Sequence, residues 1–517
     1  MSINTARVAA KRGLRVARAA KRRLDQISER LDQWPYTSRN LTIHNIAAKQ
    51  AFRRVERETH SDTATIDAGT IGSVTVDPTI PPLAWLAERI AGEWEITAGS
   101  QVELHSLGAF EGVWDGDFSD FRPDLARYVF GSGVVATRSG AVFVPPRHLE
   151  EALFALHDGN SGSTLVSNSL AYTFARAGIT TDSPFFHEVA RSLQGHAFEE
   201  CRKGVDRVVP LIAASESYRL YMCNYFNFAV DGSGRPYREW LPATREFRSF
   251  SDYRHLLETT TLRLFDNGRN IGRATPLTPM TTLSSGYDSA AVSAIAATQG
   301  CEHALTLAVN VYGHDDNGTP VANALGLSVQ ERRHVMGDQI LALDVESGDH
   351  LFEKAAEFLA TFGIGDDVTF LAFQDDLPKT TLTTGVWGDS IWARGTTVPS
   401  GLPVRILFGK SLSEFRLRVG FAHVPLPFIG GRYAESARRL SLSQDMEPYS
   451  VGGSYDRPIA RRLAEEGGVP RSAFGTNKSA TSPWIKNNAD MFPAAMELVI
   501  KRYSGTPHVR FASGQGS

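Results

Sequence analysis

A polar turn at residues 284–289 carries the groups that bind a phosphate. It follows a short strand ending at Leu283 and precedes a helix of small residues, and it reads Ser284-Ser285-Gly286-Tyr287-Asp288-Ser289. A helix N-terminus presents unpaired N–H groups and a positive dipole end, so anions bind there. The serine hydroxyls add donors, and a glycine lets the backbone approach an anion closely. We therefore expect a phosphate-binding turn formed by Ser284, Ser285, Gly286, Asp288 and Ser289.

Two carboxylates are placed to hold a cation at this turn. Asp288 would repel a phosphate unless a cation such as Mg²⁺ lies between them. A second acid, Asp389, comes just after the β-branched strand expected at residues 380–384. Acids at neighbouring strand ends can hold Mg²⁺ against the same phosphates, so we expect Asp288 and Asp389 to be its ligands. The turn is not a Walker loop, because Val404 stands where the Gly409-Lys410-Ser411 sequence would need its first glycine.

The second half of the chain alternates between strand and helix signals. Ser251 is expected to cap an amphipathic helix. After the turn we expect a strand at 304–309, helices at 321–325 and 351–362, and the strand at 380–384. Such alternation is typical of a parallel sheet covered by helices, with its site at the carboxyl ends of the strands. We therefore assign residues 249–517 to an α/β domain.

The first half has a mixed pattern. We expect a strand at 71–76, helices at 82–90 and 165–177, and a hairpin at 128–144. An aromatic run at 221–230 leads into a glycine turn, which is a further hairpin signal. Residues 36–248 are therefore expected to form an α+β domain.

The N-terminal segment has a composition of its own. Residues 1–23 contain eight basic residues and no acidic one, and an apolar stripe continues until Pro35. This pattern predicts a basic amphipathic helix over residues 1–35. Residues 1–34 could contact an anionic membrane surface or a protein partner, or form a solvated helix or frayed tail.

Composition sets broad bounds on the function. A length of 517 residues indicates two or three domains. The net charge of −3 gives no reason to expect specific nucleic-acid binding. The three cysteines have no metal-ligand spacing and suit a reducing cytoplasm, which is the expected location. No run approaches the length of a transmembrane helix.

The turn resembles the pyrophosphate-binding S-G-G-x-D-S loop of the asparagine synthetase-like ATP pyrophosphatases, the PP-loop family. Ser285 replaces one of its glycines. Residues 384–390, Thr-Gly-Val-Trp-Gly-Asp-Ser, resemble the family's T-G-E-G-A-D-E segment, with Val386 and Ser390 in place of the glutamates. A helix starting at Pro458 and a proline-containing turn then lead to Lys478, in the family's order. The resemblance covers residues 250–482.

The resemblance implies an ATP- and Mg²⁺-dependent ligase that adenylates a carboxylate, releases pyrophosphate and transfers the acyl group to ammonia or an amine. Its partners would be small-molecule carboxylate and amine substrates. Lys478 would be the catalytic residue, stabilising negative charge on the acyl-adenylate or tetrahedral species.

At two places the sequence differs from the family's motifs, and these differences limit the reactions and substrates that we expect. The N-terminus lacks the cysteine nucleophile of glutamine-dependent members, so glutamine hydrolysis is not expected, and residues 36–248 could be a degenerate amidotransferase domain. Pro427-Phe428-Ile429-Gly430 lacks the aspartate of the family's P-F-L-D segment, so aspartate is not the expected substrate. Two alternatives stay open: a catalytically degenerate synthetase-fold binding protein, and an enzyme inserting sulfur or nitrogen into nucleic acid.

Overall fold

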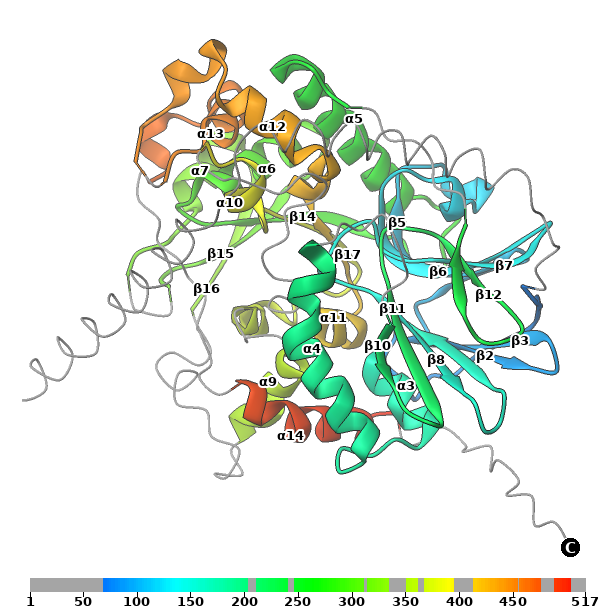
Figure 1. The fold of residues 1–517 in the computed structure, drawn as a ribbon. Helices are drawn as coiled ribbons and strands as arrows, with labels where there is room; N and C mark the ends of the chain where they lie inside the picture. The colour runs from blue at the N-terminus through cyan, green and yellow to red at the C-terminus, as the bar shows by residue number, and fades with distance from the viewer. Residues whose placement is uncertain are drawn as a thin grey trace, which may run out of the picture. The chain divides into compact units, whose positions relative to one another are not determined.

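The computed structural model describes residues 68–202, 211–239, 246–310, 314–333, 350–360, 367–394, 412–453, 455–475 and 488–503, which contain three β-sheets (Figure 1). The helix predicted for residues 1–35 lies outside the described residues, and so does Lys478.

Two of the sheets come from the first half of the chain. The seven-stranded sheet has the spatial order β1 (Thr70–Val76), β3 (Glu93–Ala98), β2 (Trp85–Ile90), β9 (Thr164–Ser167), β8 (Leu153–Asp158), β11 (Tyr218–Cys223) and β10 (Leu211–Ala214). Its pairs are antiparallel except β1 with β3. The antiparallel six-stranded sheet has the order β13 (Pro236–Arg238), β12 (Phe228–Val230), β7 (Gly140–Val144), β6 (Val129–Thr137), β5 (Gly108–Trp114) and β4 (Glu103–His105).

These two sheets face each other across a shared apolar core. Trp85 and Trp94 of one sheet contact Phe143 of the other, with ring centroids 6.4 and 4.8 Å apart respectively. Aromatic rings bury large apolar areas and dominate the stability of such cores. The first half is therefore a β-sandwich.

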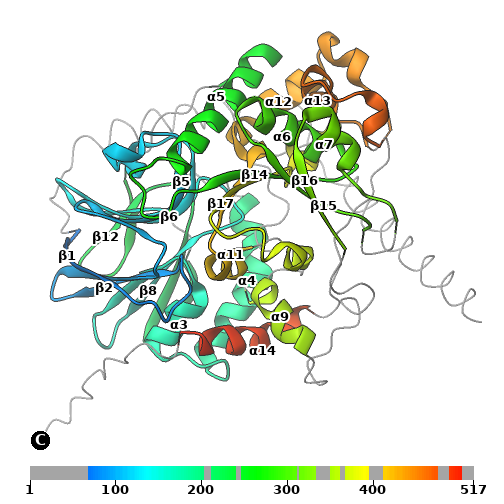
Figure 2. The same cartoon turned by 180° about the vertical axis from the view of Figure 1, so that it is seen from behind.

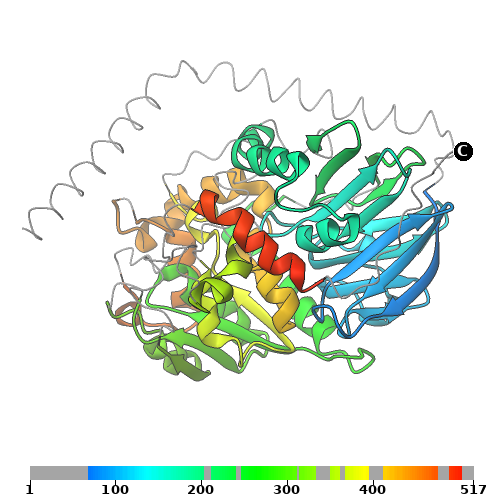
Figure 3. The same cartoon turned by 90° about the horizontal axis from the view of Figure 1, so that it is seen from below.

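Helices cover the outer face of the seven-stranded sheet. They are α3 (Leu170–Ala177) and α4 (Pro184–Arg202), joined by the C-terminal α14 (Asn488–Lys501), which is red in Figure 3. Tyr172 of α3 stacks on Tyr503 at 4.7 Å, and Phe186 of α4 stacks on Phe492 of α14 at 5.3 Å. The end of the described chain is thereby packed against its first half.

The third sheet is entirely parallel. Its order is β16 (Ser328–Arg332), β15 (His303–Leu307), β14 (Thr278–Leu283), β17 (Thr380–Thr384) and β18 (Ala422–Pro425). One face is covered by α5 (Phe250–Gly268), α6 (Tyr287–Thr298), α7 (Thr319–Leu325), α12 (Ala434–Ser441) and α13 (Pro458–Glu466). The other face is covered by α9 (His350–Leu359) and α11 (Ser413–Val419) (Figure 2). The expected α/β class and parallel sheet are confirmed.

Short helices complete the described chain. They are α10 (Gly388–Ile391) and the 3-10 helices η1 (Phe118–Asp120), η2 (Pro123–Leu125), η4 (Val368–Phe373), η5 (Leu426–Phe428), η6 (Gly431–Tyr433), η7 (Gln444–Tyr449) and η8 (Arg471–Ala473).

Most local predictions agree with the structure, and three were wrong. The strand at 380–384 has its predicted bounds, and the hairpin at 128–144 is formed by β6 and β7. Residues 85–90 form strand β2 and not a helix, because β3 and β9 pair with it on both edges. The helix expected at 165–177 starts only at Leu170, after β9, and Ser249 rather than Ser251 caps α5.

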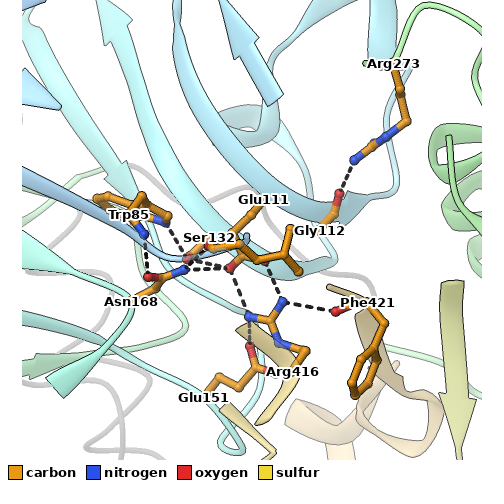
Figure 4. A network of polar contacts seen from close by, with 10 residues as sticks. Trp85, Glu111, Gly112, Ser132, Glu151, Asn168, Arg273, Arg416 and Phe421 are labelled. Carbon is orange, nitrogen blue, oxygen red and sulfur yellow. Dashed lines mark hydrogen bonds and ion pairs between the residues drawn. The ribbon is translucent and has the colours of Figure 1, made fainter. Parts of the chain in front are cut away.

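A buried ion-pair network joins the sandwich to the parallel-sheet half (Figure 4). Arg416 of α11 contacts both carboxylate oxygens of Glu111 on β5, at 2.6 and 3.0 Å, and Glu151 Oε2 at 2.9 Å. Ser132 Oγ donates to Glu111 Oε1 at 2.9 Å. Buried charges are stable only when they are paired and hydrogen-bonded, so this network fixes α11 against β5.

Candidate functional site

The polar turn has the predicted strand–turn–helix form. β14 ends at Leu283, and α6 begins at Tyr287 with Gly286 at its N-cap. The N–H of Ser284 donates to Ser289 Oγ at 3.1 Å, and the two hydroxyl oxygens lie 2.9 Å apart. These hydrogen bonds tie the strand end to the first turn of α6. The turn therefore presents a helix N-terminus, where anions are favoured.

A buried carboxylate that sequence reasoning missed contacts the turn. Asp316, between β15 and α7, accepts hydrogen bonds from the N–H and the hydroxyl of Ser285, at 3.2 and 2.7 Å. Burial raises the pKa of Asp316, and the hydrogen bonds from Ser285 oppose that shift. Ser285, which we expected to bind phosphate, thus donates to a protein carboxylate in this structure. No local motif marks Asp316, since it reaches the turn through the pairing of β15 with β14.

The structure brings the two predicted motifs together. Gly385 and Gly388, in the loop after β17, lie directly against Asp288. A Cβ atom at Gly388 would lie 2.6 Å from Asp288 Cγ, and one at Gly385 would lie 2.7 Å from the Asp288 carbonyl carbon. Only glycine allows such close approach. Asp389, the second predicted ligand, follows Gly388 in α10.

Sheet topology explains why these two loops meet. β14 and β17 are hydrogen-bonded neighbours, for example at Thr281 and Thr383. From β14 the chain moves outward to β15 and β16, and it then returns to the other side of β14 as β17 and β18. Loops at such a reversal diverge and leave a crevice at the carboxyl ends of the strands, where ligands bind in open α/β sheets. The candidate site lies at this switch point.

An arginine that sequence reasoning missed is ion-paired with Asp288. Arg457, just before α13, contacts Asp288 Oδ2 through Nη1. Its guanidinium carbon lies 4.5 Å from the ring centroid of Tyr455, which stacks on Tyr287 at 4.7 Å. Burial and the Asp288 charge raise the pKa of Tyr455 to about 12, so its hydroxyl is neutral at pH 7. Local pattern could not reveal this pair, because its members are 169 residues apart.

The donor set of the site fits a hard cation. Asp288 and Asp389 would supply carboxylate oxygens, which Mg²⁺ prefers, and Mg²⁺ commonly binds one or two protein carboxylates together with phosphate oxygens and waters. In the part of the chain that the structure describes, no cluster of three or more His, Cys, Asp or Glu side chains is arranged to hold a metal. Arg457 already contacts one carboxylate oxygen of Asp288.

Two side-chain hydrogen bonds fix the loop that follows β17. Thr384 Oγ1 and His423 Nε2 share a hydrogen bond of 2.8 Å, and Trp387 Nε1 donates to a carboxylate oxygen of Glu150. Burial and the nearby Arg416 charge lower the pKa of His423 to about 3, so its imidazole is neutral. Trp387 has a φ of 69°, a left-handed conformation that is uncommon for a non-glycine residue and that this packing sustains.

The third predicted segment is described only in part. α13 begins at Pro458 as expected, and the N–H of Gly475 donates to the Ser285 carbonyl at 2.8 Å. The chain thus passes the turn three residues before Lys478, which itself lies outside the described residues.

Comparisons with known proteins do not assign this chain to a family. No family model and no curated protein matches the sequence. One solved structure with some similarity is a predicted subunit of tRNA methyltransferase from Methanocaldococcus jannaschii, 15% identical, with a TM-score of 0.20 over 40% of this chain and 97% of that chain. A TM-score this low carries no argument about fold or function. Among the described helices, none is both long and apolar enough to cross a membrane.

Proposed function

We propose that this protein is an asparagine synthetase-like ligase that uses ATP and Mg²⁺ to adenylate a carboxylate and transfers the acyl group to ammonia or an amine. One observation carries the proposal. The Ser284–Ser289 turn and the Asp389 loop, two motifs about a hundred residues apart, meet at the switch point of a parallel sheet. Its partners are small-molecule carboxylates and amines, and the proposed location is the cytoplasm.

In this proposal the turn binds the pyrophosphate part of ATP. The positive end of the α6 dipole and the hydroxyls of Ser284 and Ser289 face the phosphates, and Gly286 lets the backbone approach them. Asp288 and Asp389 would hold Mg²⁺, which neutralises phosphate charge when bound. Arg457 would hold the Asp288 carboxylate beside the β17 loop.

The reaction proceeds in two steps. A carboxylate oxygen of the acid attacks the α-phosphorus of ATP, the bond to the β-phosphate oxygen breaks, and pyrophosphate leaves. The amine nitrogen then attacks the acyl carbon, the amide forms, AMP leaves with the bond electrons, and the nitrogen loses a proton. Lys478 is proposed to stabilise the negative charge of the second step.

Carboxylate-dependent exchange of labelled pyrophosphate into ATP tests the first step directly. We expect exchange with at least one acid of a broad panel, and loss of exchange in Asp389→Asn. Asp445→Asn, at an exposed position in η7, is the matched control. Lys478→Ala should retain exchange but lose amide formation. If no acid supports exchange, the ligase proposal is wrong.

A catalytically degenerate binding protein is the second candidate, and two contacts favour it. Asp316 engages the Ser285 donors, and Arg457 engages Asp288, so groups that ATP and Mg²⁺ would need already have protein partners. This candidate predicts ATP binding that needs no Mg²⁺ and persists in Asp288→Ala and Asp389→Ala. Calorimetric titration with ATP, with Mg²⁺ or with a chelator, distinguishes it from the ligase.

A further inference from the structure

A tyrosine hydroxyl lies beside the polar turn. Tyr455, just before α13, is half-buried, and its hydroxyl oxygen lies 3.5 Å from the position that a Cβ atom on Gly286 would take. Gly286 is the N-cap of α6, and Ser284 Oγ lies 3.2 Å from the same position. Two hydroxyl groups therefore flank the start of α6, which is where a phosphate approaches a helix most readily.

Packing fixes the ring of Tyr455. The ring stacks on the buried ring of Tyr287, with their centroids 4.7 Å apart, and the guanidinium carbon of Arg457 lies 4.5 Å from its centroid. The backbone is held as well, because the carbonyl of Asp456 accepts a hydrogen bond of 3.0 Å from the N–H of Arg394, just after α10. The ring, and with it the hydroxyl, is thereby held beside the turn.

The hydroxyl of Tyr455 has a proton to donate at neutral pH. Burial and the Asp288 charge raise the pKa of Tyr455 to about 12, although the charge of Arg457 and a hydrogen bond from the backbone N–H of Tyr287 oppose this shift. In that hydrogen bond the phenol oxygen is the acceptor. A phenol oxygen can accept one hydrogen bond and still donate its own proton to another group.

We propose that the Tyr455 hydroxyl donates a hydrogen bond to a phosphate oxygen of the nucleotide bound at the Ser284–Ser289 turn. The inference rests on the nucleotide-binding part of the proposed function, to which it adds a residue that contacts the ligand. A hydrogen bond to a charged phosphate oxygen is about twice as strong as one between neutral groups. A neutral phenol also supplies this donor without placing another cation beside Arg457 and the proposed Mg²⁺.

Calorimetric titration of the full chain with ATP and Mg²⁺ tests the inference. Tyr455→Phe removes the hydroxyl and keeps the ring that stacks on Tyr287. We expect its dissociation constant for ATP to rise at least about tenfold, the loss of one hydrogen bond to a charged group. Its thermal unfolding midpoint without ligand should stay close to that of the wild type, which separates lost binding from lost folding.

The matched control is Tyr449→Phe. Tyr449 is a half-buried tyrosine in η7, and the guanidinium carbon of Arg462 lies 5.4 Å from its ring centroid. This variant should bind ATP as the wild type does. Equal weakening in Tyr449→Phe and Tyr455→Phe would overturn the proposal, because the effect would then not be specific to the hydroxyl beside the turn.

Two further measurements distinguish the hydroxyl from the ring. The ratio of the ATP affinities of wild type and Tyr455→Phe should be the same at pH 7 and pH 9, because the hydroxyl keeps its proton at both values. Tyr455→Leu removes both the ring and the hydroxyl, and it should weaken ATP binding at least as much as Tyr455→Phe. If Tyr455→Leu binds ATP weakly while Tyr455→Phe binds it as the wild type does, only the ring contributes and the proposal is wrong.

Pyrophosphate exchange separates this inference from the ligase proposal. Exchange by the wild type together with equal ATP affinity in Tyr455→Phe would overturn the role of Tyr455 and leave the ligase standing. Weaker ATP binding by Tyr455→Phe without exchange for any acid would support the role of Tyr455 and overturn the ligase. A wild type that binds no ATP would overturn both.

Discussion

The guanidinium of Arg457 is ion-paired with the carboxylate of Asp288. Arg457 precedes α13 and Asp288 lies in the first turn of α6, and these two helices pack against each other. Their side chains are only 7% and 16% exposed, so solvent screens the pair weakly. The negative charge of the carboxylate proposed to bind Mg²⁺ is therefore already balanced by Arg457. A metal ion must compete with Arg457 for this carboxylate.

Arg457→Met should make the stability of the protein depend on Mg²⁺. The substitution leaves Asp288 partly buried without its cation, which costs up to about 3–5 kcal/mol for a buried pair. If Asp288 and Asp389 hold Mg²⁺, the metal should restore much of this loss and raise the unfolding midpoint of the variant more than that of the wild type. Thermal unfolding with Mg²⁺ and with a chelator measures the difference.

The control for this experiment is Arg462→Met, in α13. Arg462 is ion-paired with Glu466 at 2.7 Å, away from Asp288, so its loss should not change the response to Mg²⁺. An equal response in both variants would argue against a metal site at Asp288.

Gly388→Ala should disrupt the site more than the fold. The new Cβ atom would lie 2.6 Å from Asp288 Cγ, which forces the carboxylate to move. Overpacking of this kind costs about 1–3 kcal/mol. The predicted result is a folded protein whose pyrophosphate exchange falls at least about tenfold, equivalent to 1.4 kcal/mol. In Gly232→Ala, where a Cβ atom meets nothing within 4 Å, stability and exchange should both be retained.

Arg416→Met should be among the most destabilising single substitutions. It leaves Glu111 and Glu151 buried without their shared cation, and removal of one partner of a buried pair costs about 3–5 kcal/mol. Urea unfolding measures the loss. Arg438→Gln breaks an exposed pair with Glu435, for which about 0–1 kcal/mol is expected. Similar midpoints for the two variants would show that the network contributes little.

His423 should make the protein less stable in acid. Its pKa is lowered to about 3 by burial and by Arg416, whereas an unfolded histidine titrates near 6.5. Between these values the unfolded state binds more protons, so the contribution is complete above pH 6.5 and is lost as the pH falls toward 3.

One extra proton bound by the unfolded state lowers the free energy of unfolding by at most about 1.4 kcal/mol for each pH unit by which the pH falls. His423→Gln can keep the hydrogen bond to Thr384, and its stability should fall less steeply between pH 6.5 and 4. His148 has a pKa lowered in the same direction by burial, so part of the slope should remain. Unfolding by urea at several pH values measures both slopes, with His255→Gln on the exposed surface of α5 as the matched control. Parallel slopes in wild type and His423→Gln would contradict the assignment.

Local signals in the sequence were sufficient to predict several of the strands and helices that carry the candidate site. The serines and glycine after Leu283 indicated a strand–turn–helix, and β-branched residues marked β17 at its observed bounds. Pro458 indicated the start of α13, and the helix predicted at 321–325 ends where α7 ends. These signals are local because a cap, a turn or a side-chain alternation involves only residues a few positions apart.

At residues 85–90 the local sequence pattern predicted a helix, and the structure has a strand. Their apolar spacing suited a helix, yet β3 and β9 supply hydrogen-bond partners on both edges, and Trp85 enters the sandwich core. Pairing and burial outweigh intrinsic propensity in such a strand.

The sequence by itself determined that a serine-rich turn with one acid, and a second acid, follow two strands of an α/β domain. Only the tertiary structure decided that those strands are neighbours at a switch point, that Gly388 lies against Asp288, and that Asp288 and Ser285 contact Arg457 and Asp316. Strand order and ion pairs between distant segments depend on how whole elements pack, and no short stretch of sequence encodes that arrangement.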